Sequence, residues 1–152
     1  MRVVADTNTA LSGLLWHGPP RQLIDLAREG AITLYTSIAL LAELAEVIGR
    51  AQFAARVRAA DVSPTDLVQD YARLAEIAVP ASLPGPVSRD PDDDLVLATA
   101  LAARAFLIVS GDRDLLELDT FRDIRIVGAA DALVMIGRQR YRRPASTILP
   151  TS

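Results

Sequence analysis

The chain has 152 residues, about the length of one domain, and its 51% hydrophobic and 23% charged residues are ordinary for a globular protein. No apolar run approaches the roughly 18 residues of a membrane span and no signal-peptide pattern opens the chain, so we expect a cytoplasmic protein without a membrane partner. It contains no cysteine, no lysine and one histidine, which excludes disulfides, thiolate zinc sites and catalytic lysines. Carboxylates are abundant, with 14 Asp and 5 Glu, so any catalysis is expected to use aspartate and a hard metal ion.

Charge is unevenly distributed along the sequence. Residues 1–137 carry 12 Arg and 19 acids, a net charge of −7, whereas residues 138–152 carry 4 Arg and no acid, a net charge of +4. This pattern predicts a folded domain over residues 1–137 and an Arg-rich C-terminal tail over residues 138–152. The tail is either a solvated chain end or a segment that binds phosphates or a protein partner, as Tyr141 between its arginines suggests. The sequence leaves both interpretations open.

Strand and helix patterns alternate along the chain. The first strand, residues 2–5, is followed by a polar loop up to Gly18, and a helix then opens at Pro19-Pro20 and stops at Gly30. Further strands are predicted at residues 32–36, 77–79, 106–109 and 124–127. Further helices are predicted at residues 38–48, 51–60, 64–74, 92–104 and 129–136, with a short helical turn after Asp114. This alternation predicts an α/β fold with a central, mostly parallel sheet of about five strands flanked by helices.

Several acids fall where the predicted strands end. Asp6 closes the first strand, and Asp112 and Asp114 follow the fourth. Glu43 lies early in the helix after the second strand, and Asp94 lies in the first turn of the helix before the fourth. Because sites in parallel α/β sheets form at the carboxyl ends of the strands, these carboxylates are expected to meet at one rim, where clustered negative charge favours Mg²⁺.

Simpler interpretations apply to some of these acids. An aspartate in the first turn of a helix usually complements the helix dipole, which is the interpretation we favour for Asp92 and Asp93. Glu43 cannot be ranked above Glu46 from the residues alone, although Glu46 is spaced to pair with Arg50. Asp6 is the hardest to explain structurally, because a buried charge is costly unless it is paired or bound to metal.

Four segments, taken in order, resemble the motifs of PIN-domain nucleases, and in particular the toxin components of bacterial toxin–antitoxin systems. The first is the Asp-Thr-Asn opening at residues 6–8, and the second is the Glu-containing stretch at residues 41–48. The third is the acidic run at residues 89–98, and the fourth is the Ser-Gly-Asp-Arg-Asp stretch within residues 109–116. The resemblance covers about residues 1–135.

The resemblance implies a PIN-like three-layer fold and RNA cleavage that depends on Mg²⁺ or Mn²⁺. It also implies a homodimer and inhibition by an antitoxin protein. Carried over by position, the acidic quartet would be Asp6, Glu43, Asp94 and Asp112, which also serve as the metal ligands. Accessory roles would fall to the polar supports Asn8 and Ser110 and to the acid Asp114, and the choice between Asp112 and Asp114 stays open. Rim arginines such as Arg89 and Arg113 are candidates for positioning RNA phosphates.

The sequence is also compatible with two other functions. A non-catalytic PIN-like module would bind RNA or a protein without cutting, although all four acidic positions are filled. A metal-dependent phosphatase commonly uses an Asp-x-Asp nucleophile motif, whereas Asp6 is followed by Thr7 and Asn8. The three candidate functions therefore differ in the reaction: the nuclease hydrolyses RNA, the phosphatase hydrolyses other phosphate esters, and the binding module catalyses no reaction.

Overall fold

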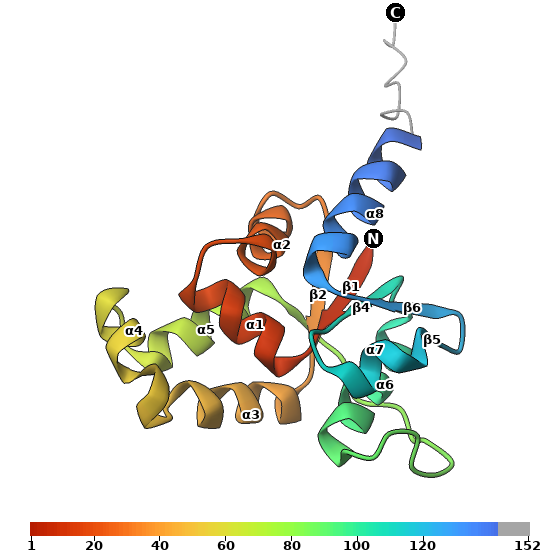
Figure 1. Ribbon diagram of the computed structural model, residues 1–152, viewed down its shortest axis with the longest axis horizontal. Coiled ribbons are helices and arrows are strands. Elements are labelled where there is room, and N and C mark those ends of the chain that lie inside the picture. Colours follow the sequence, from red (N-terminus) through yellow and green to blue (C-terminus); the bar gives the residue numbers. More distant parts are fainter. Residues whose placement is uncertain (143–152) are drawn as a thin grey trace, which may run out of the picture.

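A six-stranded sheet forms the centre of the computed structural model, which describes residues 1–142 (Figure 1). The strand order is β3-β2-β1-β4-β6-β5, and all neighbouring strands are parallel except β5 and β6. The strands are β1 (Arg2–Ala5), β2 (Thr33–Thr36), β3 (Glu76–Ile77), β4 (Leu107–Val109), β5 (Thr120–Phe121) and β6 (Ile124–Val127). The predicted mostly parallel α/β sheet is therefore confirmed, with one more strand than expected.

Eight α-helices and one short 3-10 helix surround the sheet within the described residues. They are α1 (Thr7–Leu15), α2 (Pro19–Arg28), α3 (Ile38–Ile48), η1 (Ala51–Phe53), α4 (Ala54–Ala59), α5 (Pro64–Leu74), α6 (Pro91–Ala103), α7 (Arg113–Leu118) and α8 (Ala129–Arg142). None of these helices is long and apolar enough to cross a membrane.

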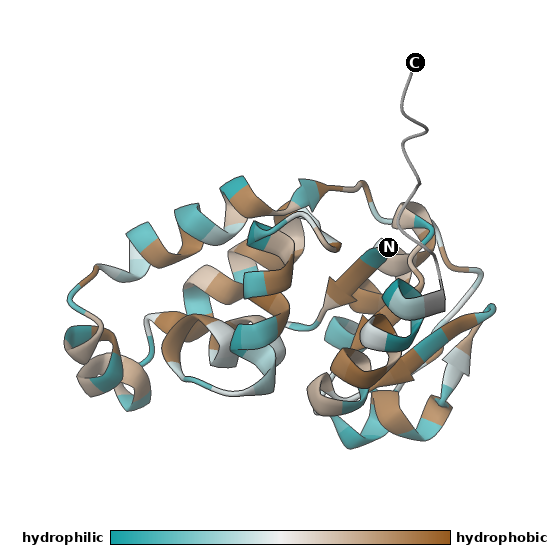
Figure 2. Cartoon of the chain, turned by 90° about the horizontal axis from the view of Figure 1, so that it is seen from above, coloured by the Kyte–Doolittle hydropathy of each residue, from teal (hydrophilic) through white to brown (hydrophobic). Residues whose placement is uncertain are grey.

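The alternation of side chains along each strand divides the core between the two faces of the sheet. Val3, Leu107 and Val109 face a core completed by α1, α2, α3, α5 and α8. The next residues along the same strands, Val4 and Ile108, face a second core against α6 and α7. Figure 2 shows the result, with hydrophobic strands in the interior and hydrophilic residues on outward helix surfaces.

The structure corrects the expected loop after β1, because residues 7–15 form α1. The side chain of Asp6 caps this helix by accepting a hydrogen bond from the Thr9 amide at 2.8 Å. Ala10, Leu11 and Leu14 then recur at helical spacing and are buried in the core. Burial of these apolar side chains therefore stabilises α1, although the polar residues Thr7, Asn8 and Thr9 at its start are typical of a loop.

Three other elements differ from the prediction. The helix expected over residues 51–60 is divided into η1 and α4, and the two-residue strand β5 was missed. The last helix was expected to end at residue 136, but α8 runs through Gly137 to Arg142 and crosses the expected start of the tail. In Figure 1 this end of α8 projects away from the sheet. The rest of the predicted tail, residues 143–152, lies outside the described residues.

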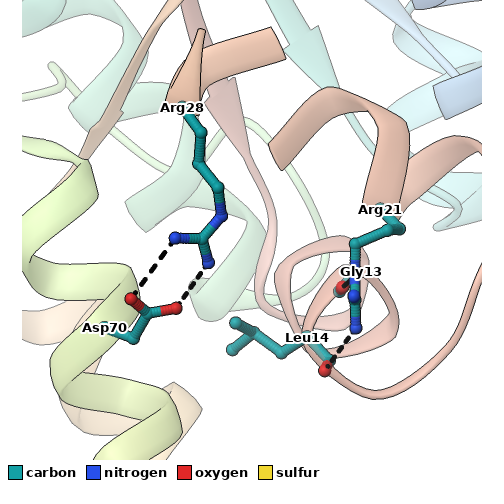
Figure 3. Close-up of polar contacts among 5 residues, drawn as sticks. All are labelled: Gly13, Leu14, Arg21, Arg28 and Asp70. Atoms are coloured by element: carbon teal, nitrogen blue, oxygen red, sulfur yellow. Dashed lines mark hydrogen bonds and ion pairs between the residues drawn. The ribbon is translucent and has the colours of Figure 1, made fainter. Parts of the chain in front are cut away.

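Two arginines on α2 connect it to neighbouring helices (Figure 3). Arg21 donates to the backbone carbonyls of Gly13 and Leu14, near the end of α1 where carbonyls lack helical partners. Arg28 forms a two-armed ion pair with Asp70 of α5. These contacts fix α2 over the sheet on the face opposite α6.

Candidate active site

Three helices begin at one edge of the sheet, and each is capped by an aspartate. Asp6 caps α1 directly after β1, Asp112 caps α7 just after β4, and Asp90 caps α6. The capped amides are those of Thr9, Asp114 and Asp92, at 2.8, 2.8 and 2.9 Å. An aspartate at such a position is stabilised by the positive end of the helix dipole, so three negative groups can be held close together here.

Ser110 links two of these caps. Its buried hydroxyl donates to Oδ2 of Asp6 at 2.5 Å and accepts from the amide of Asp112 at 2.9 Å. Since Asp6 follows β1 and Ser110 follows the neighbouring strand β4, this hydroxyl joins two segments that are 104 residues apart in the sequence. The predicted supporting role of Ser110 is consistent with this position.

The three caps border a small pocket of about 70 Å³. Its lining is almost entirely polar and acidic: Asp6, Thr7, Asn8, Glu43, Asp90, Asp92, Asp93, Val96 and Asp112. Oxygens of Asp90, Asp93 and Asp112 all lie within 4.8 Å of one another. That spacing is comparable with the roughly 4.2 Å between opposite ligands of an octahedral cation at about 2.1 Å, so the three carboxylates fit around one divalent ion.

An unpartnered hydroxyl supports the same interpretation. Thr7 lines the pocket and is buried, yet its Oγ1 has no hydrogen-bond partner among the described residues. It lies close enough to the Glu43 carboxylate to oppose part of the pKa shift of that group without completing a hydrogen bond. A buried polar atom of this kind normally has a partner, and a hydrated cation in the pocket would supply one.

The electrostatics of the pocket also favour a cation. Burial, followed by the charge of Asp112, raises the pKa of Asp93 to about 6. Burial likewise raises the pKa of Glu43, and the neighbouring charges of Asp92, Asp90 and Asp6 act in the same direction. These carboxyls thus resist full ionisation when only protein surrounds them, and a divalent cation would favour their charged forms.

The structure brings together most of the predicted site residues. Asp6, Glu43, Asp112 and Asn8 line the pocket, and Ser110 supports two of them. Asp114 is exposed and is not among the lining residues. Glu46, the alternative to Glu43, instead forms an exposed ion pair with Arg50.

Asp94 is placed differently from the expectation. Its carboxylate accepts hydrogen bonds from the backbone amides of Ser88, at 2.7 Å, and Val87, and it is not among the residues lining the pocket. Asp94 therefore fastens the loop before α6, whereas Asp93, assigned from the sequence to the helix dipole, is buried in the pocket. Successive helical residues project about 100° apart, so the three aspartates of this turn point in different directions: Asp92 and Asp93 line the pocket and Asp94 does not.

A signal for Asp93 was present in the sequence. Val96, Leu97 and Ala100 lie three, four and seven residues after Asp93, and all are buried, so Asp93 continues the inward stripe of α6. Asp90 could have been recognised as the residue that precedes Pro91, where helix caps are common. The roles of Arg89 and Arg113 stay predictions: both are exposed next to the caps Asp90 and Asp112.

Comparison with known families agrees with this geometry. The family model described as the PIN domain matches residues 2–114, well over half of the chain, and the matched region contains every residue of the pocket. The chain therefore belongs to the PIN-domain family, as the sequence motifs predicted. No curated protein and no solved structure gives a significant match. PIN domains are generally metal-dependent nucleases, and the acidic cluster has the groups to hold such a metal.

Proposed function

We propose that this protein is a metal-dependent endoribonuclease that hydrolyses phosphodiester bonds in RNA. The observation that carries the proposal is the cluster of Asp90, Asp93 and Asp112, whose oxygens lie within 4.8 Å of one another in a pocket that also contains the unpartnered hydroxyl of Thr7. Membership of the PIN-domain family supports the same class of chemistry.

The proposed metal ligands come from separate parts of the chain. Asp93 and Asp112 would bind the ion directly, with Asp90 at the rim. Asp6 and Glu43 would complete the site directly or through water. This set revises the sequence-based quartet, because the contacts of Asp94 with Val87 and Ser88 direct its carboxylate to the loop. When bound, Mg²⁺ or Mn²⁺ supplies acidification of water and neutralisation of phosphate charge.

The chain's own residues would prepare the site for this reaction. Ser110 and the Thr9 amide occupy one oxygen each of Asp6, which fixes the orientation of its carboxylate. Asn8, exposed at the pocket, is placed to contact the substrate, and Arg89 and Arg113 flank the rim to position phosphates. In the net reaction, water adds at phosphorus and the bond to the 3′ oxygen breaks, which leaves a 5′-phosphate and a 3′-hydroxyl.

We also propose a biological setting: the protein is the toxin of a toxin–antitoxin pair. In that setting it acts in the cytoplasm as a homodimer, and a separate antitoxin protein inhibits it. Support comes from the order and spacing of the four motifs within a chain of 152 residues. Induced expression should arrest bacterial growth, and Asp93→Asn should relieve the arrest at equal protein level; arrest that persists with this variant would contradict the toxin assignment.

Cleavage of a mixed RNA by the purified chain tests the proposed activity. Cutting should require Mg²⁺ or Mn²⁺ and stop with EDTA. Asp93→Asn should reduce the rate at least about 100-fold, since it removes a ligand charge without changing side-chain size. The matched control is Asp94→Asn, one residue along the same helix, which should retain most of the activity.

Each outcome of this comparison has a definite meaning. Loss of activity in Asp94→Asn but not in Asp93→Asn would restore the sequence-based quartet. Activity that survives both substitutions would indicate a contaminant or a different site. Tight RNA binding by a folded, metal-loaded chain that cuts none of the RNA would favour the non-catalytic module.

A further inference from the structure

A second cavity lies away from the acidic pocket, between α8, the strand β6 and the residue that precedes β4. It has a volume of about 470 Å³, and the residues that matter for its chemistry are Phe106, Arg125, Asp131, Val134, Arg138 and Gln139. We call it the α8 groove. Phe106 precedes β4 and Arg125 is near the start of β6, so the groove extends to the amino ends of the strands, whereas the acidic pocket is at their carboxyl ends.

The groove exists because α8 leaves part of the sheet uncovered. Val127 lies on the sheet face that packs against α8, and Arg125, two residues earlier, shares that face. No helix of the described chain covers Arg125, which is exposed. Val134, on the flank of α8, is 52% exposed, and Phe106 is 37% exposed. The exposed apolar side chains of Val134 and Phe106 therefore form part of a groove that also contains Arg125 and Arg138.

The arginines of this region are available for a ligand. Elsewhere Arg21 and Arg56 bind backbone carbonyls, and Arg28 and Arg50 form ion pairs. Within residues 1–142 the guanidinium groups of Arg125, Arg138 and Arg140 make no hydrogen bond or ion pair, as is also true of exposed arginines such as Arg58 and Arg73. What distinguishes Arg125 and Arg138 is that both line the same groove.

The position of α8 extends this basic surface. Its last turns carry Arg138, Arg140 and Tyr141, and the ring of Tyr141 is 92% exposed where the helix projects from the body (Figure 1). Arginines near the carboxyl end of a helix complement its dipole, which would account for Arg138 and Arg140. The dipole does not account for Arg125, which comes from a different element and enters the same groove.

We propose that the α8 groove binds single-stranded RNA at a position separate from the acidic pocket. Arg125 and Arg138 would contact the phosphates, while Phe106 and Tyr141 would offer ring faces for bases, a combination typical of single-strand binding surfaces. The groove lining carries Arg125 and Arg138 against one acid, Asp131, and Arg140 lies further along α8, so this surface is net basic and complements a polyanion. The choice of RNA rests on the proposed nuclease function, and the groove would hold the part of the substrate that lies outside the site of cleavage.

Binding of a fluorescein-labelled 20-nucleotide oligouridylate, measured by anisotropy in EDTA, tests the groove without cleavage. Arg125→Ala/Arg138→Ala should weaken binding at least 10-fold at low salt. It should also make the slope of log affinity against log salt shallower by about 1.4, the value for two phosphate contacts on a single strand. The matched control is Arg58→Ala/Arg73→Ala, which removes two exposed arginines from α4 and α5 and should change both quantities little.

The outcomes separate this inference from the proposed activity. Equal weakening by both double variants, or no weakening by the groove variant, would overturn the inference even if the wild-type chain cuts RNA. Groove-dependent binding by a chain that never cuts would support the inference and contradict the nuclease. If the groove variant binds RNA normally but changes mass in light scattering, the groove is an interface between two copies and the proposal is wrong. Arg125→Lys/Arg138→Lys should preserve most of the salt slope, because it keeps the charges.

Discussion

The hydroxyl of Ser110 donates a hydrogen bond to Oδ2 of Asp6 and so ties the end of β4 to the end of β1. The Ser110 hydroxyl oxygen also accepts a hydrogen bond from the backbone amide of Asp112, so both aspartates are bound to one side chain. A single buried side chain therefore sets the relative position of two of the acids in the pocket.

Ser110→Ala is expected to loosen this arrangement. It removes one hydrogen bond to a carboxylate and one from an amide, and should lower the free energy of unfolding by about 2 kcal/mol. Mn²⁺ affinity, measured by calorimetry, should fall roughly 10-fold, as is usual when the support of a metal ligand is lost. Ser110→Thr keeps the hydroxyl and should restore the affinity. If the alanine variant binds Mn²⁺ like the wild type, the positioning role is wrong.

Asp6 has two roles that different substitutions separate. Asparagine caps helices as well as aspartate does, so Asp6→Asn should keep the bond to the Thr9 amide. Its amide nitrogen replaces the Oδ2 that accepts from Ser110, so we expect a loss of about 1 kcal/mol in stability. The variant should also lose metal-dependent cleavage, since the charge is gone. Asp6→Ala loses the cap as well and should cost about 1 kcal/mol more in thermal unfolding. Equal stability of the two variants would argue against the capping role.

The pH dependence of the metal-free chain follows from Asp93. Its folded-state pKa, about 6, lies above the ordinary value, so the folded chain holds this proton more tightly than the unfolded chain does. Ionisation of Asp93 therefore costs stability as the pH rises through 6, and lowering the pH from 7.5 to 5 in EDTA should increase this contribution to stability.

Asp93→Asn provides the comparison. The variant lacks the titrating group and should be more stable than the wild type at pH 7.5 in EDTA, with a smaller difference at pH 5. Added Mn²⁺ should stabilise the wild type more than the variant. Thermal melts at the two pH values, with and without Mn²⁺, check all three expectations. A variant that is less stable than the wild type at pH 7.5 in EDTA would show that the buried, ionised Asp93 does not destabilise the metal-free chain.

Gly13 permits the close packing of α1 on α2. A Cβ atom at this position would lie 2.6 Å from Cδ1 of Ile24 and 2.8 Å from the Pro20 carbonyl oxygen. Gly13→Ala should therefore destabilise the fold by about 1–3 kcal/mol, although alanine is the better helix former. Gly137→Ala, in α8, meets no atom within 4 Å and serves as the control, which should be neutral or stabilising in denaturant titrations. Similar effects of the two substitutions would contradict the tight α1–α2 contact.

The sequence was sufficient to predict the α/β class and the rim that carries the acids, because βα alternation and strand-end aspartates are local patterns. It was insufficient for α1 and β5. The helix α1 depends on burial of Leu11 and Leu14 against a sheet whose other strands are far along the chain. The strand β5 has two residues and is defined only by its antiparallel pairing with β6. Both are consequences of tertiary contacts.

The site shows the same division between local and tertiary information. Three aspartates in a row identify the first turn of α6, but the direction in which each side chain projects from that turn decides which of them line the pocket. Asp90, as the cap, and the buried stripe that includes Val96 set these directions, and they direct Asp93 inward and Asp94 to the Ser88 amide. The family motif indicated this segment, and the helical geometry distinguishes Asp93, which lines the pocket, from Asp94, which does not.

The sheet order also governs when the pocket can form during synthesis. β1 is made first, yet one of its two neighbours is β4, which ends at Val109, and Asp112 follows still later. A growing chain that stops before these residues has no second partner for β1, no hydroxyl for Asp6 and no complete acidic cluster. Any chain truncated before Val109 therefore lacks part of β4, the Ser110 hydroxyl and Asp112, and cannot assemble the acidic cluster, although it contains Asp6, Glu43, Asp90 and Asp93.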